Sequence, residues 1–132
     1  MHHGVLFVSR SKKDAQALSE ILEPLSVPVV HVPSIQHARQ RLDHELFGVV
    51  LTESELPDGN WRDILDLARS EAPGSAVVVT DPRADNRLWM DALDLGAYDL
   101  VCQPFCCSEV QRILSNALAA PPELRHASHT AL

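Results

Sequence analysis

Five short aliphatic runs alternate along this chain with segments of helical periodicity. Helices on both faces of a parallel sheet leave its strands fully covered, so such strands read as continuous apolar runs. Repeated strand and helix units of this length favour one parallel sheet over any all-α or all-β arrangement. We therefore predict an α/β fold, whose strands are expected at 5–8, 27–32, 48–52, 76–80 and 98–102.

The second run carries Pro28. Proline cannot donate to a strand ladder, so this run suits the edge of a sheet. The right-handed crossover rule leaves few strand orders, and 2-1-3-4-5 places this strand at an edge. The predicted fold is a flavodoxin-like (βα)5 sandwich, a five-stranded parallel sheet with helices on both faces.

Capping residues mark where the helices begin. Ser11, Ser34 and Asn60 each precede an apolar set at helical spacing, and Ser108 to Gln111 reads as a capping box for the last helix. Gly96 is a predicted C-cap. The apolar faces are expected to hold Ala15, Leu18, Ile21, Leu22, Leu25; Ile35, Ala38, Leu42, Leu46; Trp61, Ile64, Leu65, Ala68; Leu88, Ala92, Leu95; and Val110, Ile113, Leu114, Leu118.

The length and charge limit what the chain can do. At 132 residues it has one domain's worth of sequence, which we expect to fold over residues 1–120, with 121–132 forming a tail or the start of a linker. The formal net charge of −7 argues against binding to nucleic acid or to an anionic membrane, since both need a cationic surface.

All three cysteines, Cys102, Cys106 and Cys107, fall within six residues. This odd, clustered set cannot form a disulfide framework, so the cytoplasm is the expected location. Small, partly buried thiols are a simpler interpretation than a metal site, because no second cysteine pair exists and the histidines are scattered. The N-terminus has neither a signal-peptide pattern nor a membrane-spanning run, so we expect no membrane association.

Polar residues end four of the predicted strands. Ser9 and Arg10 follow the first, Glu53 the third, Thr80 the fourth, and Gln103 the fifth. In open α/β sheets the working crevice lies beyond the carboxyl ends of the strands. These side chains therefore form a candidate site, although Glu53 read alone could equally be the first solvated residue after a strand.

With these tips, the order of Pro57, Gly96 to Leu100 and Gln103 to Phe105 resembles the response-regulator receiver domain, the phospho-accepting module of two-component signalling. The resemblance covers about residues 4 to 119. It implies that Glu53 stands at the phospho-acceptor position. By the same resemblance, Ser9 and Arg10 match the acidic pair that holds Mg²⁺ in receivers, and Thr80 matches the hydroxyl residue that binds the phosphoryl group. Gln103 matches the lysine that precedes the proline after the last strand. Trp61 matches the glycine of the turn that follows the acceptor, and Leu100 matches the aromatic switch position.

Most of these positions depart from the family pattern. Mg²⁺ requires near-octahedral oxygen ligands, and replacing two carboxylates with a hydroxyl and a guanidinium removes them. Glu53 extends its carboxylate about 1.5 Å beyond that of an aspartate, and displacements of about 1 Å can cost on the order of 100-fold in rate. We therefore predict no metal, no cofactor and no Mg²⁺-dependent phosphorylation.

Three descriptions of the altered pocket stay open. Arg10 and Glu53 could form an ion pair that replaces the metal bridge. Glu53 could reach Thr80 and mimic the phosphorylated state, or the pocket could be a decayed polar patch.

The predicted function is a cytoplasmic pseudo-receiver that acts as a phosphorylation-independent signalling and protein-interaction module, not an enzyme. The alternative is a working phospho-receiver that uses Glu53 or a nearby acceptor. A flavodoxin-like enzyme or nucleotide binder is disfavoured, because no glycine-rich loop follows the first strand.

A binding module needs a partner surface. Receivers commonly associate through helix 4, strand 5 and helix 5, so the resemblance implies a protein partner or a homodimer through that face. Trp61 could cover the pocket or merely begin a helix. The adjacent Cys106 and Cys107 also suggest a redox switch, in which the two thiols form a disulfide. Such a switch would require a lowered thiol pKa. The partner-face candidates are Trp89, Met90, Leu93, Leu100, Cys106 and Cys107.

Overall fold

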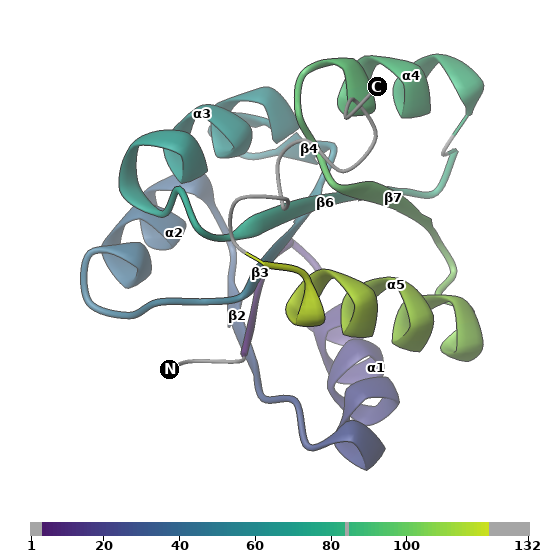
Figure 1. Cartoon of the computed structure of the whole chain (residues 1–132). Coiled ribbons are helices and arrows are strands. Elements are labelled where there is room, and N and C mark those ends of the chain that lie inside the picture. The colour runs from purple at the N-terminus through teal and green to yellow at the C-terminus, as the bar shows by residue number, and fades with distance from the viewer. Residues whose placement is uncertain (1–3, 84, 122–132) are drawn as a thin grey trace.

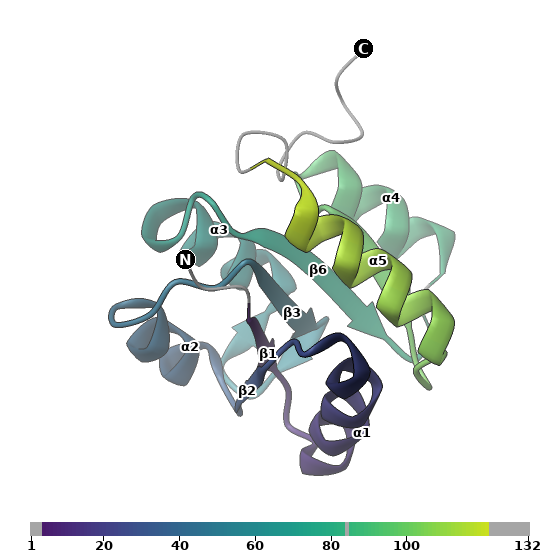
Figure 2. The same cartoon turned by 60° about the horizontal axis from the view of Figure 1, so that its bottom comes forward.

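The structure is a computed structural model that describes residues 4–83 and 85–121. Its main sheet has five parallel strands in the order β2-β1-β3-β6-β7, which confirms the predicted flavodoxin-like order (Figures 1 and 2). Apart from Pro121, the predicted tail lies outside the described residues. The strands are β1 (Val5–Val8), β2 (Val29–Val32), β3 (Val49–Glu53), β6 (Ala76–Asp81) and β7 (Asp99–Cys102).

Helices cover both faces of this sheet (Figure 2). One buried cluster joins the sheet to α1 (Lys12–Leu22) and α5 (Cys107–Ala119). The other joins it to α2 (Ile35–Leu42), α3 (Trp61–Glu71) and α4 (Asn86–Asp94). The central strands β1, β3 and β6 are consequently buried throughout, apart from the partly exposed Glu53 at the tip of β3.

The edge position of β2 is confirmed. Val5 N–H donates to the Pro28 carbonyl at 2.9 Å, so the chain enters the ladder just before β2 begins. Proline at this point contributes an acceptor without needing to donate. A 3₁₀ turn, η1 (Glu23–Leu25), separates α1 from this strand.

Three of the four predicted N-caps are confirmed. Ser11, Ser34 and Asn60 each accept a backbone N–H in the first turn of their helix, and Asn60 forms a reciprocal capping box with Asp63. The predicted capping box at Ser108 is wrong. Helix α5 begins earlier, with Cys106 as its N-cap and no side-chain cap hydrogen bond.

The loops account for the other differences. A small hairpin of β4 (Glu55–Leu56) and β5 (Gly59–Asn60) follows β3, where only a turn was predicted. Leu25, Leu46 and Leu95 are exposed by 41%, 69% and 41%, contrary to the predicted apolar faces. Leu25 belongs to the 3₁₀ turn η1 and not to α1. Leu46 lies beyond the end of α2 and Leu95 is the C-cap of α4, so neither continues a helical stripe. None of the helices in the described ranges is long and apolar enough to cross a membrane.

Candidate functional site

The residues of the predicted site meet where β1 and β3 end. The Ser9 hydroxyl donates to Glu53 Oε2 at 2.8 Å, and the backbone N–H of Arg10 donates to Glu53 Oε1 at 3.1 Å. Because β1 and β3 are adjacent parallel strands, their tips place the carboxylate directly beside these two donors. Both oxygens of Glu53 are therefore engaged by the residues that end β1.

The Arg10 guanidinium contributes less than its backbone. Its Nε lies 4.0 Å from Glu53 Oε1, and the Arg10 side chain is 61% exposed, against 15% for Glu53. An ion pair at this distance with one solvated partner is weak. The predicted Arg10 to Glu53 pair is thus present, but hydrogen bonds from Ser9 and the Arg10 backbone hold the carboxylate.

Thr80 lies next to Glu53 across the sheet, in register on β6. Its hydroxyl is buried, and among the described residues Thr80 Oγ1 has no hydrogen-bond partner. Glu53 points its oxygens at Ser9 and Arg10 instead. The contact that a Glu53 phosphate mimic would require is therefore not made.

Gln103 turns toward α1. Its Nε2 donates to Asp14 Oδ2 at 3.0 Å, which ties the loop after β7 to the first turn of α1. The peptide bond between Gln103 and Pro104 is cis. The structure thus brings together Ser9, Arg10, Glu53 and Thr80, while the Gln103 amide is committed to another carboxylate.

The residues present do not fit a magnesium ion. One carboxylate, one hydroxyl and a nearby guanidinium do not supply the oxygen set that Mg²⁺ requires. Within residues 4–83 and 85–121, no three His, Cys, Asp or Glu side chains gather as a metal-binding group.

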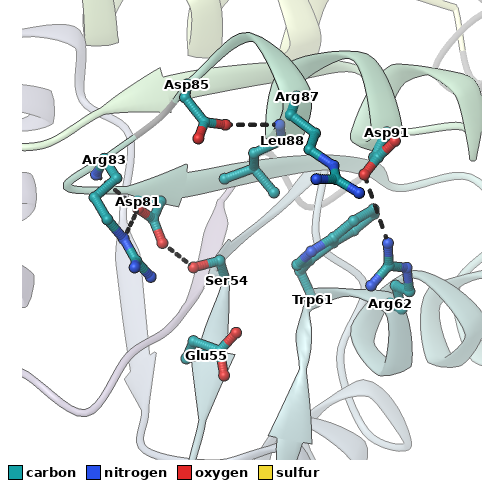
Figure 3. A pocket seen from close by; sticks show the side chains of 10 residues that line it. All are labelled: Ser54, Glu55, Trp61, Arg62, Asp81, Arg83, Asp85, Arg87, Leu88 and Asp91. Carbon is teal, nitrogen blue, oxygen red and sulfur yellow. Dashed lines mark hydrogen bonds and ion pairs between the residues drawn. The ribbon is translucent and has the colours of Figure 1, made fainter.

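A second polar site, drawn in Figure 3, contains Ser54 and Asp81, the residues that directly follow Glu53 and Thr80 in the chain. Its centre is Asp81, which is 5% exposed and directly follows Thr80. Asp81 Oδ2 accepts a hydrogen bond from the Ser54 hydroxyl, and Oδ1 accepts one from the Arg83 backbone at 2.6 Å. Sequence reasoning missed this site, because Asp81 before a proline reads as a turn residue. The pocket is lined by Ser54, Glu55, Trp61, Arg62, Asp81, Arg83, Asp85, Arg87, Leu88 and Asp91.

Trp61 is a core residue that also lines this second pocket. It is 4% exposed and packs in the cluster beneath α2, α3 and α4. The guanidinium of Arg62 lies 4.7 Å from the centre of its ring. The tryptophan therefore begins α3 and borders a pocket, although not the one formed by Glu53.

The partner-face candidates divide by burial. Trp89 and Met90 on α4 are 45% and 59% exposed. Leu93 is half-buried, and Cys106 and Cys107 are exposed free thiols. Leu100 is a correction, because it is buried in the core cluster under α4 and cannot take part in a surface.

Cys106 has an environment that favours its thiolate. The Ser108 hydroxyl lies 3.5 Å from its Sγ. This hydroxyl, together with the backbone N–H groups of Glu109 and Ser108, lowers the pKa of the Cys106 thiol below its ordinary value. The cysteine pair stands reduced at the start of α5.

No protein-family model matches the sequence. Among curated proteins, the chain is 26% identical over 85 residues to the response regulator protein PilR from Pseudomonas aeruginosa. That match covers 64% of this chain but 19% of PilR, so the chain spans a small part of its relative's length.

Several solved structures are similar to this chain over most of its length. The signal receiver domain of a putative LuxO repressor protein from Vibrio parahaemolyticus has a TM-score of 0.85 at 18% identity, over 98% of each chain. The beryllofluoride-activated NtrC4 receiver domain dimer has a TM-score of 0.80 at 23% identity, over 86% of this chain and 94% of that one.

A third similar structure is the receiver domain of the sensor histidine kinase PA1611 from Pseudomonas aeruginosa, described with magnesium coordinated in its active-site cleft. Its TM-score is 0.78 at 18% identity, over 91% of this chain and 100% of that one. The chain therefore has the fold of response-regulator receiver domains, and the resemblance identified in the sequence is confirmed at the level of that fold.

Proposed function

We propose that this chain is an atypical receiver domain that signals through protein contacts without being phosphorylated. The supporting observation is the state of Glu53, whose two carboxylate oxygens are engaged by Ser9 and by the Arg10 backbone. An attacking carboxylate would have to leave these donors and meet a phosphoryl group with no fitting metal site beside it. The proposed role involves no catalytic turnover, and the cytoplasm is its proposed location.

The test is a titration with Mg²⁺ and beryllofluoride, followed by the ¹H–¹⁵N signals of the Arg10 and Thr80 amides. The Arg10 N–H donates to the Glu53 carboxylate, and Thr80 lies across the sheet from Glu53. We expect no saturable change that requires both ions. Mass spectrometry after incubation with acetyl phosphate should likewise detect no acyl phosphate.

A rebuilt site provides the positive control. The quadruple variant Ser9→Asp, Arg10→Asp, Glu53→Asp and Gln103→Lys restores the carboxylates and the cation of the receiver pattern. It should gain a Mg²⁺-dependent response in the same assay. A response of the unaltered chain equal to that of the rebuilt variant would overturn the proposal.

One observation favours the alternative, a receiver that uses Glu53 as its acceptor. Thr80 retains the hydroxyl of the receiver pattern, and that hydroxyl is buried without a partner among the described residues. A phosphoryl oxygen could accept a hydrogen bond from this hydroxyl. An acyl phosphate that forms on the unaltered chain and is lost in Glu53→Gln would establish this alternative.

We further propose that the partner is a protein bound through α4, β7 and α5. Trp89 and Met90 expose large apolar side chains on α4, and such residues dominate binding energies at interfaces. The NtrC4 relative is described as a receiver domain dimer, so a second copy of the chain is the partner to examine first.

The measurement is the molar mass in solution, by light scattering over a range of concentrations. If the chain dimerises through this face, Trp89→Ala with Met90→Ala should weaken the dimer by about 100-fold or more. Leu46→Ala is a matched control, because Leu46 is an exposed apolar residue outside the proposed face. An unchanged dimer in the double variant would rule out this surface.

A further inference from the structure

The second pocket lies between α3 and α4 and has a volume of about 310 Å³. This is at the lower end of the range for small-molecule sites, roughly 300 to 1,000 Å³, and corresponds to about ten water molecules. Figure 3 shows the pocket framed by the Ser54 and Asp81 pair, by Trp61 and by residues of α4. Its apolar surface comes from Trp61 and Leu88, and the remaining lining is polar or charged.

Three guanidinium groups border this pocket from three different segments. Arg62 belongs to α3, Arg83 to the loop after β6, and Arg87 to α4. Arginine presents a rigid set of donors that matches the oxygens of phosphate and carboxylate. Arginines that converge from separate segments can contact one small ligand from several sides.

These guanidinium groups keep most of their donors available. Arg62 Nη2 lies 3.8 Å from Asp91 Oδ2, and Arg83 Nε lies 3.7 Å from Asp81 Oδ1. Both separations exceed hydrogen-bond length. Arg87 has neither an ion-pair nor a hydrogen-bond partner among the described residues, and Figure 3 shows it between Leu88 and Asp91 at the upper side of the pocket.

Two of the four carboxylates of the lining accept hydrogen bonds from the protein. Asp81 accepts hydrogen bonds from Ser54 and the Arg83 backbone, and Asp85 Oδ1 accepts the Leu88 N–H at 2.9 Å. Asp91 faces Arg62. Glu55 lies below Ser54 in Figure 3, apart from the three guanidinium groups. Asp85 Oδ2, Asp91 and Glu55 thus keep acceptor capacity, and Arg87, which lies at ion-pair distance from none of the described carboxylates, is the guanidinium best able to take an oxyanion.

We propose that the α3–α4 pocket binds a small molecule carrying a phosphate or carboxylate group. Arg87 and Arg83 contact the oxyanion, while Arg62 and Trp61 hold the part of the ligand nearest α3. The volume fits a ligand of the size of a sugar phosphate or a dicarboxylic acid and is too small for a dinucleotide. This site is separate from the Glu53 crevice and does not depend on whether the domain is phosphorylated.

The site would join two elements that are otherwise loosely linked. Arg62 on α3 and Asp91 on α4 face each other across the pocket at 3.8 Å. A ligand that contacts Arg62 and Arg87 together would fix α4 relative to α3. Since α4 also carries Trp89 and Met90, ligand binding and partner binding would then influence each other reciprocally.

The test uses inorganic pyrophosphate and succinate as probes on the full chain, without divalent ions and at constant ionic strength maintained with sodium chloride. Two-dimensional ¹H–¹⁵N spectra should show saturable shifts of the Trp61 indole N–H and of the Ser54 and Leu88 amides for at least one probe. We expect a Kd of about 1 mM or below. A response to pyrophosphate alone identifies phosphate ligands, and a response to succinate alone identifies dicarboxylates.

Arg87→Gln should weaken binding about tenfold, as expected for the loss of one charge-assisted hydrogen bond. Arg83→Gln should weaken it by a similar factor and gives a second, independent variant. Arg112→Gln is the matched control, because it removes one positive charge from an exposed position on α5. The proposal fails if neither probe gives saturable shifts, or if Arg112→Gln weakens binding as much as Arg87→Gln does.

Discussion

The tips of β3 and β6 carry two polar sites that differ in how their groups are satisfied. Glu53 and Thr80 lie opposite each other on the two strands, and Ser54 and Asp81 follow them directly in the chain. Consecutive side chains of a strand point to opposite faces of the sheet. Residues one position apart in the chain therefore belong to different sites. In the first site Glu53 is satisfied by β1 while the Thr80 hydroxyl has no partner within the described residues.

The second site satisfies its two buried groups internally. Ser54 and Asp81 are hydrogen-bonded to each other, and both are buried. Two buried hydroxyls on neighbouring strand tips, those of Thr80 and Ser54, are thus found in opposite situations. A residue that matches a position of the receiver pattern, such as Thr80, does not necessarily stabilise the fold. Whether a buried polar residue stabilises the fold depends on its hydrogen bonds.

The largest effect is expected at Asp81. Asp81→Ala should lower the free energy of unfolding by about 2 to 3 kcal/mol, because it leaves the buried Ser54 hydroxyl unpaired and removes the acceptor of the Arg83 backbone. Glu53→Ala should cost about 1 kcal/mol, since its donors can reach water more easily. Urea unfolding of both variants measures the difference. Equal losses of unfolding free energy in Asp81→Ala and Glu53→Ala would contradict the distinction between the two sites.

The two hydroxyls should respond with opposite signs. Thr80→Val removes a buried hydroxyl that lacks a partner among the described residues, and should raise the free energy of unfolding by about 1 kcal/mol. Ser54→Ala removes a buried hydroxyl that donates to Asp81, and should lower it by about 1 kcal/mol. Chemical denaturation of the two variants beside the parent chain gives both values, and a loss of stability in Thr80→Val would contradict this interpretation.

An exposed carboxylate extends the comparison to the surface. Asp58 accepts the N–H groups of Ile35 at 2.9 Å and Gln36 at 3.1 Å, at the start of α2. Desolvation acts to raise the pKa of Asp58, but these backbone hydrogen bonds, with the nearby His37, together hold it below its ordinary value. The resulting stability is complete above the unfolded-state pKa and is lost as the pH falls through the lower folded-state pKa.

Asp58→Asn should therefore reduce stability at pH 7 by about 0.5 kcal/mol after screening by solvent, and the difference should shrink in acid. Unfolding curves at pH 7 and at several acidic pH values measure it. Asp66→Asn provides the control, because within residues 4–83 and 85–121 Asp66 makes only a long surface ion pair of 3.9 Å with Arg69. A difference that grows in acid would reverse the assigned sign.

The smallest effect is expected at Arg10. Arg10→Ala should change the free energy of unfolding by less than about 0.5 kcal/mol, because the guanidinium is exposed and the backbone N–H that holds Glu53 remains. Urea unfolding of the variant and the parent chain at low and at high salt separates the contribution of the ion pair from that of the backbone hydrogen bond. A loss of more than 1 kcal/mol at low salt, abolished at high salt, would show that the ion pair and not the backbone holds Glu53.

The sequence predicted the sheet well, because the pattern of aliphatic runs and caps is local. Pro28 correctly indicated the edge, and Ser11, Ser34 and Asn60 cap the helices they precede. It also predicted that Glu53 lies near Ser9 and Arg10, since the meeting of strand tips follows from topology alone.

The errors arose where three-dimensional contacts decide. Leu100 matched a switch position but packs in the core, and Cys106 rather than Ser108 begins α5. Asp81 was passed over because the burial of a carboxylate and its partner Ser54 cannot be read from adjacent residues. The one available signal was an acidic residue directly after an aliphatic run, the same signal that identified Glu53.

Helix α5 also has a consequence for how the chain reaches its folded state during synthesis. Phe7 and Leu51 on the central strands are buried in the cluster that α5 completes through Val110 and Leu114. The ribosome adds about 5 to 20 residues per second, so the roughly sixty residues between Leu51 and Val110 take about 3 to 12 seconds. For that time α1 is the only helix of this cluster already synthesised, and the part of the apolar face that α5 later covers stays exposed.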